Sequence, residues 1–378
     1  MGWIASSADE IAARAERELE ALVGVSSPSG DAPGAEEVLA IVQALLPGRA
    51  EVERVPCSSP DHAPDLIARL RGTGSRRVVL VGHVDTVVSH VEHRKLLREQ
   101  DRLVGSGAVD MKGGDVLAIG VMEALGRRPD AFAEVALLMV CDEEWRTAPF
   151  AHAERFAGWD ACLCFEAGQL TADGEEAVVV KRKAAGTLQV RATGVSAHSG
   201  SAPDRGRNAL LALASVAQTV AEAHDPQGPD RLTAVPTVMR SGEAFNVVPS
   251  AGELFCDLRA DRTEAFDDVL RRIPAEVGGA ELEAEMARLW PSMDAREAAA
   301  PVLERAGALI GRPVVGASRG GASDASHLAA AIPVSIDGLG PRGGGAHAPH
   351  EYVLRESLRV RAEVALAVAA AVLDMSGA

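Results

Sequence analysis

The stretch Val78-Val79-Leu80-Val81-Gly82-His83-Val84-Asp85-Thr86 decides the fold. Its first five residues form a short apolar run, which is typical of a strand buried on both faces of a parallel-type sheet. Two similar runs follow at 135–141 and 162–165, and helical stretches near 115–126 and 150–157 lie between the three runs. This alternation of strands and helices predicts an α/β domain with a central mixed sheet.

On the N-terminal side of this stretch, helical periodicity predicts helices at 8–24 and 35–47. The middle of the chain has a β-α-β-β-α-β pattern, with segments at 188–193, 208–223, 235–239, 253–259, 264–273 and 282–289. Such a pattern indicates a small two-layer α+β unit. The α/β pattern resumes at Val302 and ends in a helix at 355–373. We therefore expect a discontinuous catalytic domain, 1–183 and 290–378, interrupted by an inserted domain at 184–289.

Composition excludes several classes of protein. The 378 residues are 47% hydrophobic and 24% charged, as in soluble globular proteins. Lys and Arg number 38 against 54 Asp and Glu, a net charge of −16, which argues against a nucleic-acid partner. No apolar run approaches the ~20 residues that span a bilayer. The N-terminal stretch lacks a basic-then-apolar signal region, and five cysteines without zinc-finger spacing indicate reduced thiols, so we expect a cytoplasmic protein.

Acidic and histidine residues follow the buried runs where each predicted strand ends. The residues are His83, Asp85, Asp142, Glu143, Glu144 and Glu166. A single histidine after a strand is more often a hydrogen-bonded surface residue, and adjacent glutamates are usually solvated. In open α/β sheets, however, the carboxyl ends of strands converge on the ligand crevice. A buried carboxylate cluster needs compensating cations, and mixed oxygen and imidazole ligands suit zinc, cobalt or manganese better than calcium.

Several motifs in one order carry a family resemblance. They are 82–87 (Gly-His-Val-Asp-Thr-Val), 105–114 (Gly-Ser-Gly-Ala-Val-Asp-Met-Lys-Gly-Gly), 142–144 (Asp-Glu-Glu), Glu166, and His347 followed by 351–353 (Glu-Tyr-Val). With them the chain resembles the zinc metallopeptidase family that includes glutamate carboxypeptidase, acetylornithine deacetylase, succinyl-diaminopimelate desuccinylase and aminoacylase-1. It is most similar to the glutamate carboxypeptidase branch. The resemblance implies a homodimeric hydrolase of the zinc-exopeptidase fold that cleaves an amide bond in a small N-acyl amino acid or dipeptide.

The resemblance also implies two zinc ions per chain, for which cobalt or manganese could substitute. Asp110 would bridge the two metals, and the Asp110–Met111 peptide would be cis. The other implied ligands are His83 and Glu166 for one metal, and Glu144 and His347 for the other. His350 is an alternative to His347, because both lie in the Gly-rich segment 343–350, and the spacing to Glu351 favours His347.

Further roles follow from the same resemblance. Asp85 would orient His83, and Glu143 would be the general base. The inserted domain resembles a ferredoxin-like lid and dimerisation domain, in which His198, within 194–200, would stabilise the oxyanion in the partner's active site. The implied substrate-binding residues are Asn246, Arg259, which would bind a free substrate carboxylate, and Gly321. Arg259 could instead be a sheet-edge arginine paired with Asp257 or Asp261.

The chain departs from the family pattern at positions that bear on specificity. Trp145, Arg146 and Thr147 stand where relatives have a small or flexible Gly-Ser stretch, and Trp290 stands where glutamate-releasing relatives have a basic residue. These departures argue against recognition of a C-terminal glutamate. Both tryptophans could line an apolar acyl pocket or pack in the core. Peptide cleavage and deacylation remain open, as do a biosynthetic amide hydrolase or ligase with a specialised or carrier-bound substrate, and a non-catalytic binding protein.

Overall fold

The computed structural model describes residues 2–348 and 350–377, which form two compact units. The first unit comprises Met1–Lys181, Met293–Ser318 and Ser323–Ala378, and the second comprises Arg182–Ser292 and Arg319–Ala322. The second unit extends beyond the expected inserted domain, 184–289, by residues 182–183 and 290–292. The segment 319–322 was also expected in the catalytic domain. It lies instead in the second unit, because Arg319 O accepts from Lys183 N and Gly321 O accepts from Arg182 Nη1.

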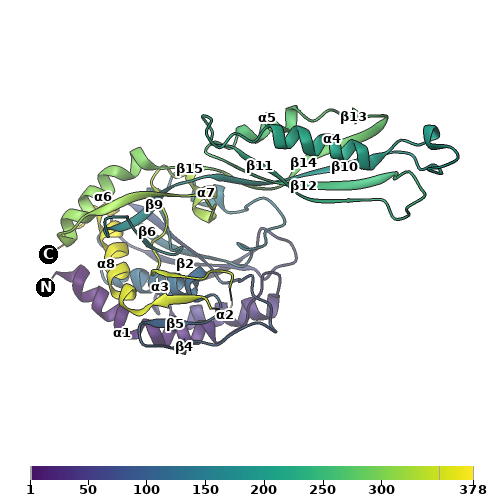
Figure 1. The fold of residues 1–378 in the computed structure, drawn as a ribbon. Coiled ribbons are helices and arrows are strands. Elements are labelled where there is room, and N and C mark those ends of the chain that lie inside the picture. Colours follow the sequence, from purple (N-terminus) through teal and green to yellow (C-terminus); the bar gives the residue numbers. More distant parts are fainter. Residues whose placement is uncertain (1, 349, 378) are drawn as a thin grey trace. The chain divides into compact units, whose positions relative to one another are not determined.

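The first unit is built on a six-stranded mixed sheet in the order β1-β2-β6-β3-β7-β17 (Figure 1). Its strands are β1 (Glu51–Val55), β2 (Asp65–Arg71), β3 (Arg77–His83), β6 (Glu134–Val140), β7 (Ala161–Cys164) and β17 (Ser335–Ile336). β3 pairs in parallel with β6 and β7, and β2 is antiparallel to β6. The predicted α/β fold with a mixed sheet is thereby confirmed.

Strand β3 is buried on both faces, as its apolar run predicts. Val78 and Leu80 belong to one hydrophobic cluster, whereas Val79 and Val81 belong to the cluster on the opposite face. This alternation follows from the two-residue period of a strand. The helices of the first unit are α1 (Trp3–Val23), α2 (Ala32–Leu45), α3 (Gly113–Gly126), α6 (Arg296–Ile310), α7 (Asp324–Ala329) and α8 (Arg355–Val372). Residues of α1, α3 and α8 line the first cluster, and residues of α7 line the second.

The helix predicted at 150–157 is wrong. Only a short 3-10 turn forms there, η2 (Ala153–Phe156). Side chains fix the preceding residues in a non-helical course, because Ala151 N donates to Ser58 Oγ and His152 Nε2 bonds Asp65 Oδ2 at 2.7 Å. The smaller elements of the first unit are β4 (Leu97–Arg98), β5 (Arg102–Val104), η1 (Ala108–Lys112), β8 (Gln169–Leu170), β9 (Glu176–Arg182), β15 (Met293–Asp294), β16 (Val314–Arg319), β18 (Gly343–Gly344) and β19 (Tyr352–Leu354).

The second unit is an antiparallel sheet in the order β11-β12-β10-β14-β13 with two main helices. Its elements are β10 (Ala184–Thr193), η3 (Pro203–Arg205), α4 (Ala209–Glu222), β11 (Thr233–Ser241), β12 (Ala251–Ala260), α5 (Ala265–Arg271), β13 (Glu276–Val277) and β14 (Ala280–Trp290). Alternate residues of β10, such as Leu188 and Val190, pack in one cluster with residues of α4 and α5. The strand and helix order is the one that the sequence pattern indicates, with the short β13 added before β14.

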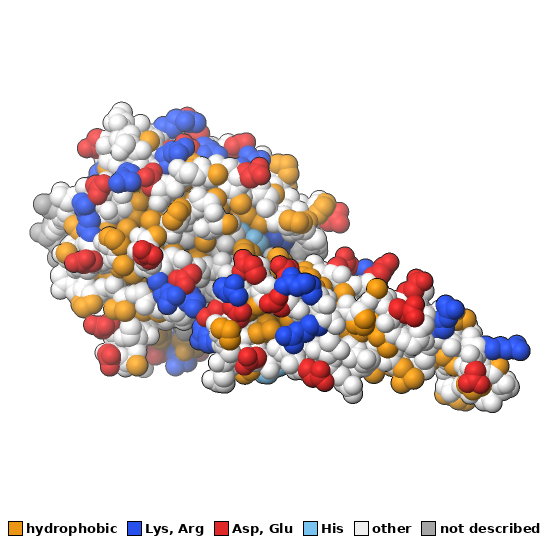
Figure 2. Space-filling view, turned by 90° about the horizontal axis from the view of Figure 1, so that it is seen from above, with side chains coloured by type: hydrophobic (Ala, Val, Ile, Leu, Met, Phe, Trp, Pro, Cys, Tyr) orange, Lys and Arg blue, Asp and Glu red, His pale blue; other side chains and the backbone are white. Residues whose placement is uncertain are grey.

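Within residues 2–348 and 350–377, none of the helices combines the length and the apolar composition that a bilayer crossing demands. Red acidic and blue basic side chains are interspersed over the face that Figure 2 shows. Such a mixture of both signs is typical of the solvated surface of a globular protein.

Candidate metal centre and active site

Parallel strand ends bring the first group of site residues together. β3 lies between β6 and β7 with all three strands parallel, so their carboxyl ends meet at one edge of the sheet. His83 is the last residue of β3, and Glu166 comes two residues after β7. Asp110 is supplied by η1, which precedes α3.

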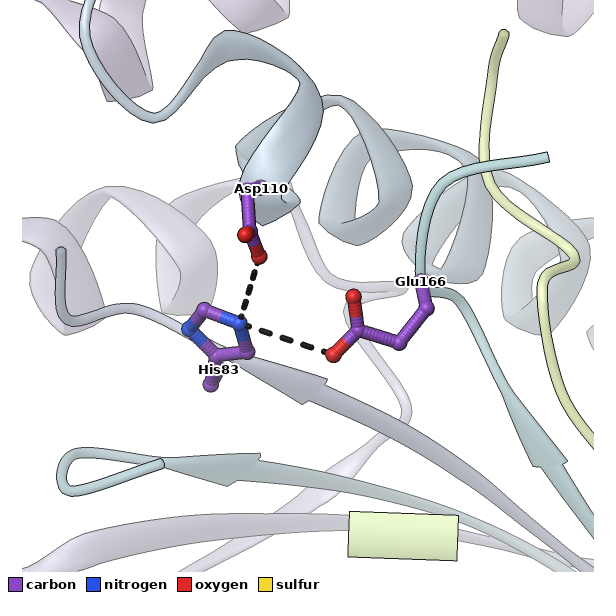
Figure 3. A group of neighbouring side chains, drawn as sticks. All are labelled: His83, Asp110 and Glu166. Carbon is purple, nitrogen blue, oxygen red and sulfur yellow. Dashed lines mark hydrogen bonds and ion pairs between the residues drawn. The ribbon is translucent and has the colours of Figure 1, made fainter. Parts of the chain in front are cut away.

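These three side chains point toward one another (Figure 3). His83 Nε2 lies 3.3 Å from Asp110 Oδ1 and 3.7 Å from Glu166 Oε1. One ligand atom from each residue falls within 4.8 Å of the others. His83 is buried, and both carboxylates are partly buried. An imidazole nitrogen and two carboxylate oxygens at this spacing form a ready-made set of donors for a transition metal.

A second group shares Asp110 with the first. His347 Nε2 lies 3.2 Å from Asp110 Oδ2 and 3.2 Å from Glu144 Oε2. Asp110 therefore directs one carboxylate oxygen to each group, and the structure brings all five predicted ligands together as two sets of three. Within the described part of the chain, His350 belongs to neither set.

The charge of the cluster supports occupancy by cations. Burial raises the pKa of Glu144, and Glu144 Oε1 has no hydrogen-bond partner among the described residues. Burial favours a neutral His83, yet the bonds to Asp110 and Asp85 outweigh it and raise the His83 pKa. Hydrogen bonds to Asp110 and Glu144 raise the pKa of His347 to about 10. Three clustered carboxylates thus favour positive charge at this site, and Glu144 Oε1 has no described hydrogen-bond partner that would compete with a cation. The donor set fits two divalent metals.

Asp85 contacts both His83 and the turn after β6. Its backbone O lies 3.1 Å and its Oδ1 lies 3.4 Å from His83 Nδ1, so Asp85 faces the imidazole through both groups and can fix the orientation of the ring. The same carboxylate accepts the backbone N–H groups of Glu143, at 3.2 Å, and Glu144, at 3.1 Å. Asp85 therefore couples the position of His83 to that of the turn that carries Glu144. The sequence analysis expected Asp85 to orient His83, but it did not reveal the contact with the turn.

Glu351 positions the loop that carries Asp110. Its buried carboxylate accepts three backbone N–H groups, from Gly107 at 2.8 Å, Val109 at 2.7 Å and Asp110 at 2.9 Å. The Asp110–Met111 peptide is cis, as predicted. The motif was recognised in the sequence, but this contact was not. The only signal was the fixed spacing between His347 and Glu351.

Glu143 is the candidate general base. It is the middle residue of the acidic turn, between Asp142 and the ligand Glu144, and it is partly buried. Burial raises its pKa well above the usual value, and the neighbouring Glu166 acts in the same direction. A carboxyl group with a raised pKa is suited to accept and return a proton near neutral pH.

The remaining predicted site residues belong to the second unit. His198 and Asn246 lie on adjacent segments, because Ser199 N donates to Asn246 O and residues 198 and 247 form a β-bridge. His198 Nδ1 accepts the N–H groups of Gly200 and Ser201, at 3.1 and 3.2 Å. These bonds place the proton of the neutral imidazole on Nε2, which becomes a hydrogen-bond donor.

Arg259 lies on β12, and its guanidinium binds Asp257 at 3.0 Å. This contact is the ion pair that the sequence left open as an alternative. Both side chains are about two-fifths exposed, so the pair is solvated and the guanidinium can still be shared with a second carboxylate. Gly321 O accepts from Arg182 Nη1 at 2.7 Å, which fixes the Gly-rich segment within the second unit.

Comparison with known proteins identifies the family. Residues 79–371 match the model of peptidase family M20/M25/M40. The chain is 26% identical to carboxypeptidase G2 of Pseudomonas sp. (strain RS-16) over 354 residues, covering 89% of this chain and 83% of that protein. It is 25% identical to succinyl-diaminopimelate desuccinylase of Nitrosospira multiformis over 358 residues, covering 88% and 91%.

Solved structures share the fold. Aminopeptidase PepT from Bacillus cereus superposes with a TM-score of 0.77 at 19% identity, covering 96% of this chain and 98% of that one. An M20 family metallo-carboxypeptidase from Sulfolobus solfataricus superposes with a TM-score of 0.72 at 16% identity, covering 94% and 98%. The family match covers most of the chain and includes every ligand in the two sets. The chain therefore belongs to peptidase family M20/M25/M40.

Proposed function

We propose that this protein is a hydrolase with two zinc ions per chain that cleaves an amide bond in a small N-acyl amino acid or dipeptide. The observation that carries the proposal is Asp110, whose two carboxylate oxygens serve two separate sets of ligands. A bridging carboxylate of this kind is typical of two-metal hydrolases. His83 and Glu166 would complete one site, and Glu144 and His347 the other.

Divalent metals held by these residues would supply Lewis acidity, which would lower the pKa of an attacking water towards ~7 and polarise the scissile carbonyl. Glu143 takes the proton from that water and delivers it to the leaving amine nitrogen. Its raised pKa suits both transfers, because a weaker carboxylic acid holds the proton long enough to return it. Asp85 keeps His83 oriented and holds the turn that carries Glu143.

The second unit contributes to substrate binding in this proposal. The Nε2–H group of His198 donates a hydrogen bond to the oxyanion that develops on the carbonyl oxygen. Arg259 binds the free carboxylate of the substrate, shared with Asp257, while Asn246 and Gly321 contact the remaining polar groups. The chain has Glu143 and all five candidate ligands, which argues against the non-catalytic alternative. Burying several carboxylates together costs free energy, and a protein that binds no metal would gain nothing from it.

We further propose that the second unit is a ferredoxin-like lid and forms a homodimer. Strand β11 is an edge strand of its sheet, and it exposes Val235, Val238 and Met239. Leu210 and Leu211 of α4 are exposed as well. An unpaired edge with exposed apolar side chains favours pairing with a second copy through a two-fold interface. In that dimer His198 acts on the substrate of the partner.

A hydrolysis screen by mass spectrometry tests the proposed activity. The protein, loaded with zinc or cobalt, is incubated with N-acetyl, N-succinyl and N-aromatic-acyl amino acids and with dipeptides. We expect turnover of one group, and a loss of roughly 10²–10⁴-fold in Glu143→Ala with metal content retained. Near-native turnover by that variant would overturn the assignment of the base. The group that is cleaved also decides between peptidase and deacylase.

A further inference from the structure

The turn after β6 carries Glu143 and Glu144 but has no regular secondary structure of its own. On one side, Asp85 binds the backbone N–H groups of both residues. Carboxylates crowd around the turn, and their mutual repulsion favours displacement of the turn. A second anchor is therefore needed to hold the two glutamates in place.

Arg146 supplies this second anchor through two carboxylates. Its Nε and Nη2 atoms donate to Asp142 Oδ1 at 3.1 and 2.9 Å. Its Nη1 and Nη2 atoms donate to the two oxygens of Asp324 at 2.6 and 3.1 Å. All three side chains are at most 3% exposed. The contact with Asp324 pairs two N–H groups with two oxygens, and a planar, bidentate contact of this kind fixes direction as well as distance, which a lysine could not do.

The partners of Arg146 are themselves held. Asp142 Oδ2 accepts the N–H and the hydroxyl of Ser59 at 2.9 and 2.7 Å, and Ser59 Oγ also accepts Thr147 N at 2.9 Å. Asp324 is the first residue of α7, whose Leu328 packs in the hydrophobic cluster beneath the sheet. Arg146 thus ties the acidic turn to α7, while Asp142 ties the same turn to Ser59.

The contacts bracket the catalytic residues in the sequence. Asp142 directly precedes Glu143, and Arg146 comes two residues after Glu144, so both flanks of the pair are fixed by one guanidinium. Between them, Trp145 is 59% exposed while its neighbour Arg146 is buried.

We propose that Arg146 is a positioning residue, which holds Glu143 and Glu144 in register with the other metal ligands by binding Asp142 and Asp324 together. The proposal rests on the proposed function of Glu143 and Glu144. The proposal adds Arg146 as the residue that determines the positions of these two carboxylates.

The test compares Arg146→Met with Arg69→Met. Arg69 binds Glu134 at 2.7 Å at the opposite end of β6, and it serves as the matched control for loss of an arginine ion pair. Four quantities are measured for each variant: kcat, KM, zinc affinity of the chelator-treated protein, and the midpoint of thermal unfolding. Arg146→Lys and Asp324→Asn complete the set, because each removes the two-carboxylate contact while changing the buried volume little.

We expect Arg146→Met to lower kcat by roughly 10–100-fold with KM changed less than about threefold, since small displacements of reacting groups have effects of this size. Zinc affinity should fall roughly 10–100-fold, as for other residues that orient ligands. Arg146→Lys should keep more thermal stability but recover little kcat. Arg69→Met should lose thermal stability alone.

The proposal is overturned if Arg146→Met loses thermal stability like Arg69→Met while kcat and zinc affinity stay at wild-type values. If Arg146→Met does not fold, wild-type kcat and zinc affinity in folded Asp324→Asn and Arg146→Lys overturn it instead. If the wild-type protein cleaves nothing in the screen, the proposed function fails. Zinc affinity alone then tests whether Arg146 is a positioning residue. Loss of zinc affinity in folded Arg146 variants, but not in Arg69→Met, would then still support positioning.

Discussion

Replacing Glu351 by glutamine should loosen the loop that carries Asp110. The Glu351 carboxylate accepts three backbone N–H groups, and within the described part of the chain Glu351 belongs to neither ligand set. Glutamine keeps the shape and one oxygen, but its amide N–H₂ group must face at least one of the three donors. The variant therefore removes acceptors from the loop without adding or deleting a metal ligand.

The structure sets the size of the effect. Loss of one charge-assisted hydrogen bond costs about 1.5–3 kcal/mol, and a buried N–H without an acceptor costs about 1–3 kcal/mol. Burial raises the pKa of Glu351 to about 7, so removal of the charge recovers part of that cost. We expect a net destabilisation of about 2–3 kcal/mol, which lowers the unfolding midpoint by roughly 2–4 °C in a chain of 378 residues. Zinc affinity should fall about 10–100-fold, because Asp110 belongs to both ligand sets.

Calorimetry of the chelator-treated protein and zinc titration against a chromophoric chelator measure these two quantities. Glu134→Gln is the matched control, since it loses a carboxylate bond to Arg69 at the far end of β6. It should lose some thermal stability and keep wild-type zinc affinity. Wild-type zinc affinity in a folded Glu351→Gln variant would refute the reasoning that Glu351 positions Asp110.

Three further predictions concern other parts of the protein. Asp85→Asn should weaken zinc binding about 10–100-fold with folding retained, because the amide N–H₂ group cannot accept from the turn, whereas the backbone bond to His83 is kept; unchanged affinity would contradict this. Burial lowers the pKa of His327 to about 4, so the unfolded chain binds the proton more tightly and the folded state loses about 2 kcal/mol as pH falls from 7.5 to 5. His327→Phe, which keeps the stacking on Phe150, should abolish that loss in paired thermal melts of chelator-treated protein, and an identical pH response of both proteins would exclude it. Val238→Asp on the β11 edge should convert a dimer into monomers by light scattering, and a wild-type protein that is already monomeric would disprove the proposed interface.

The sequence predicted the central sheet because its strands are buried on both faces. The alternation of Val78 and Leu80 with Val79 and Val81 between two clusters leaves a run with no polar residue, and such a run is visible without a structure. His83 is the last residue of this strand. The same stretch of sequence therefore indicated both the carboxyl end of the strand and the first candidate ligand. Roles beyond that point came from the family resemblance.

The contacts that hold the site could not be predicted in the same way. Arg146 and Asp324 are 178 residues apart, and Glu351 lies 244 residues from Gly107. No local period or spacing encodes such pairs, since they depend on which loops the finished sheet brings together. The absent helix at 150–157 has the same cause, because bonds from His152 to Asp65 and from Ala151 to Ser58 override a weak local preference.

The supports of the site share one physical feature, which explains why residues that bind no metal are needed. The ligand carboxylates repel one another, so their side chains alone cannot define a stable arrangement. Asp85 accepts N–H groups of the turn after β6, and Glu351 accepts N–H groups of the loop that carries Asp110. Both residues thereby fix the backbone of segments that carry candidate ligands. Arg146 fixes the same turn from its other side. Because these bonds are present in the chain itself, the two candidate ligand sets are already arranged, and binding of metals there would not require the loops to become ordered.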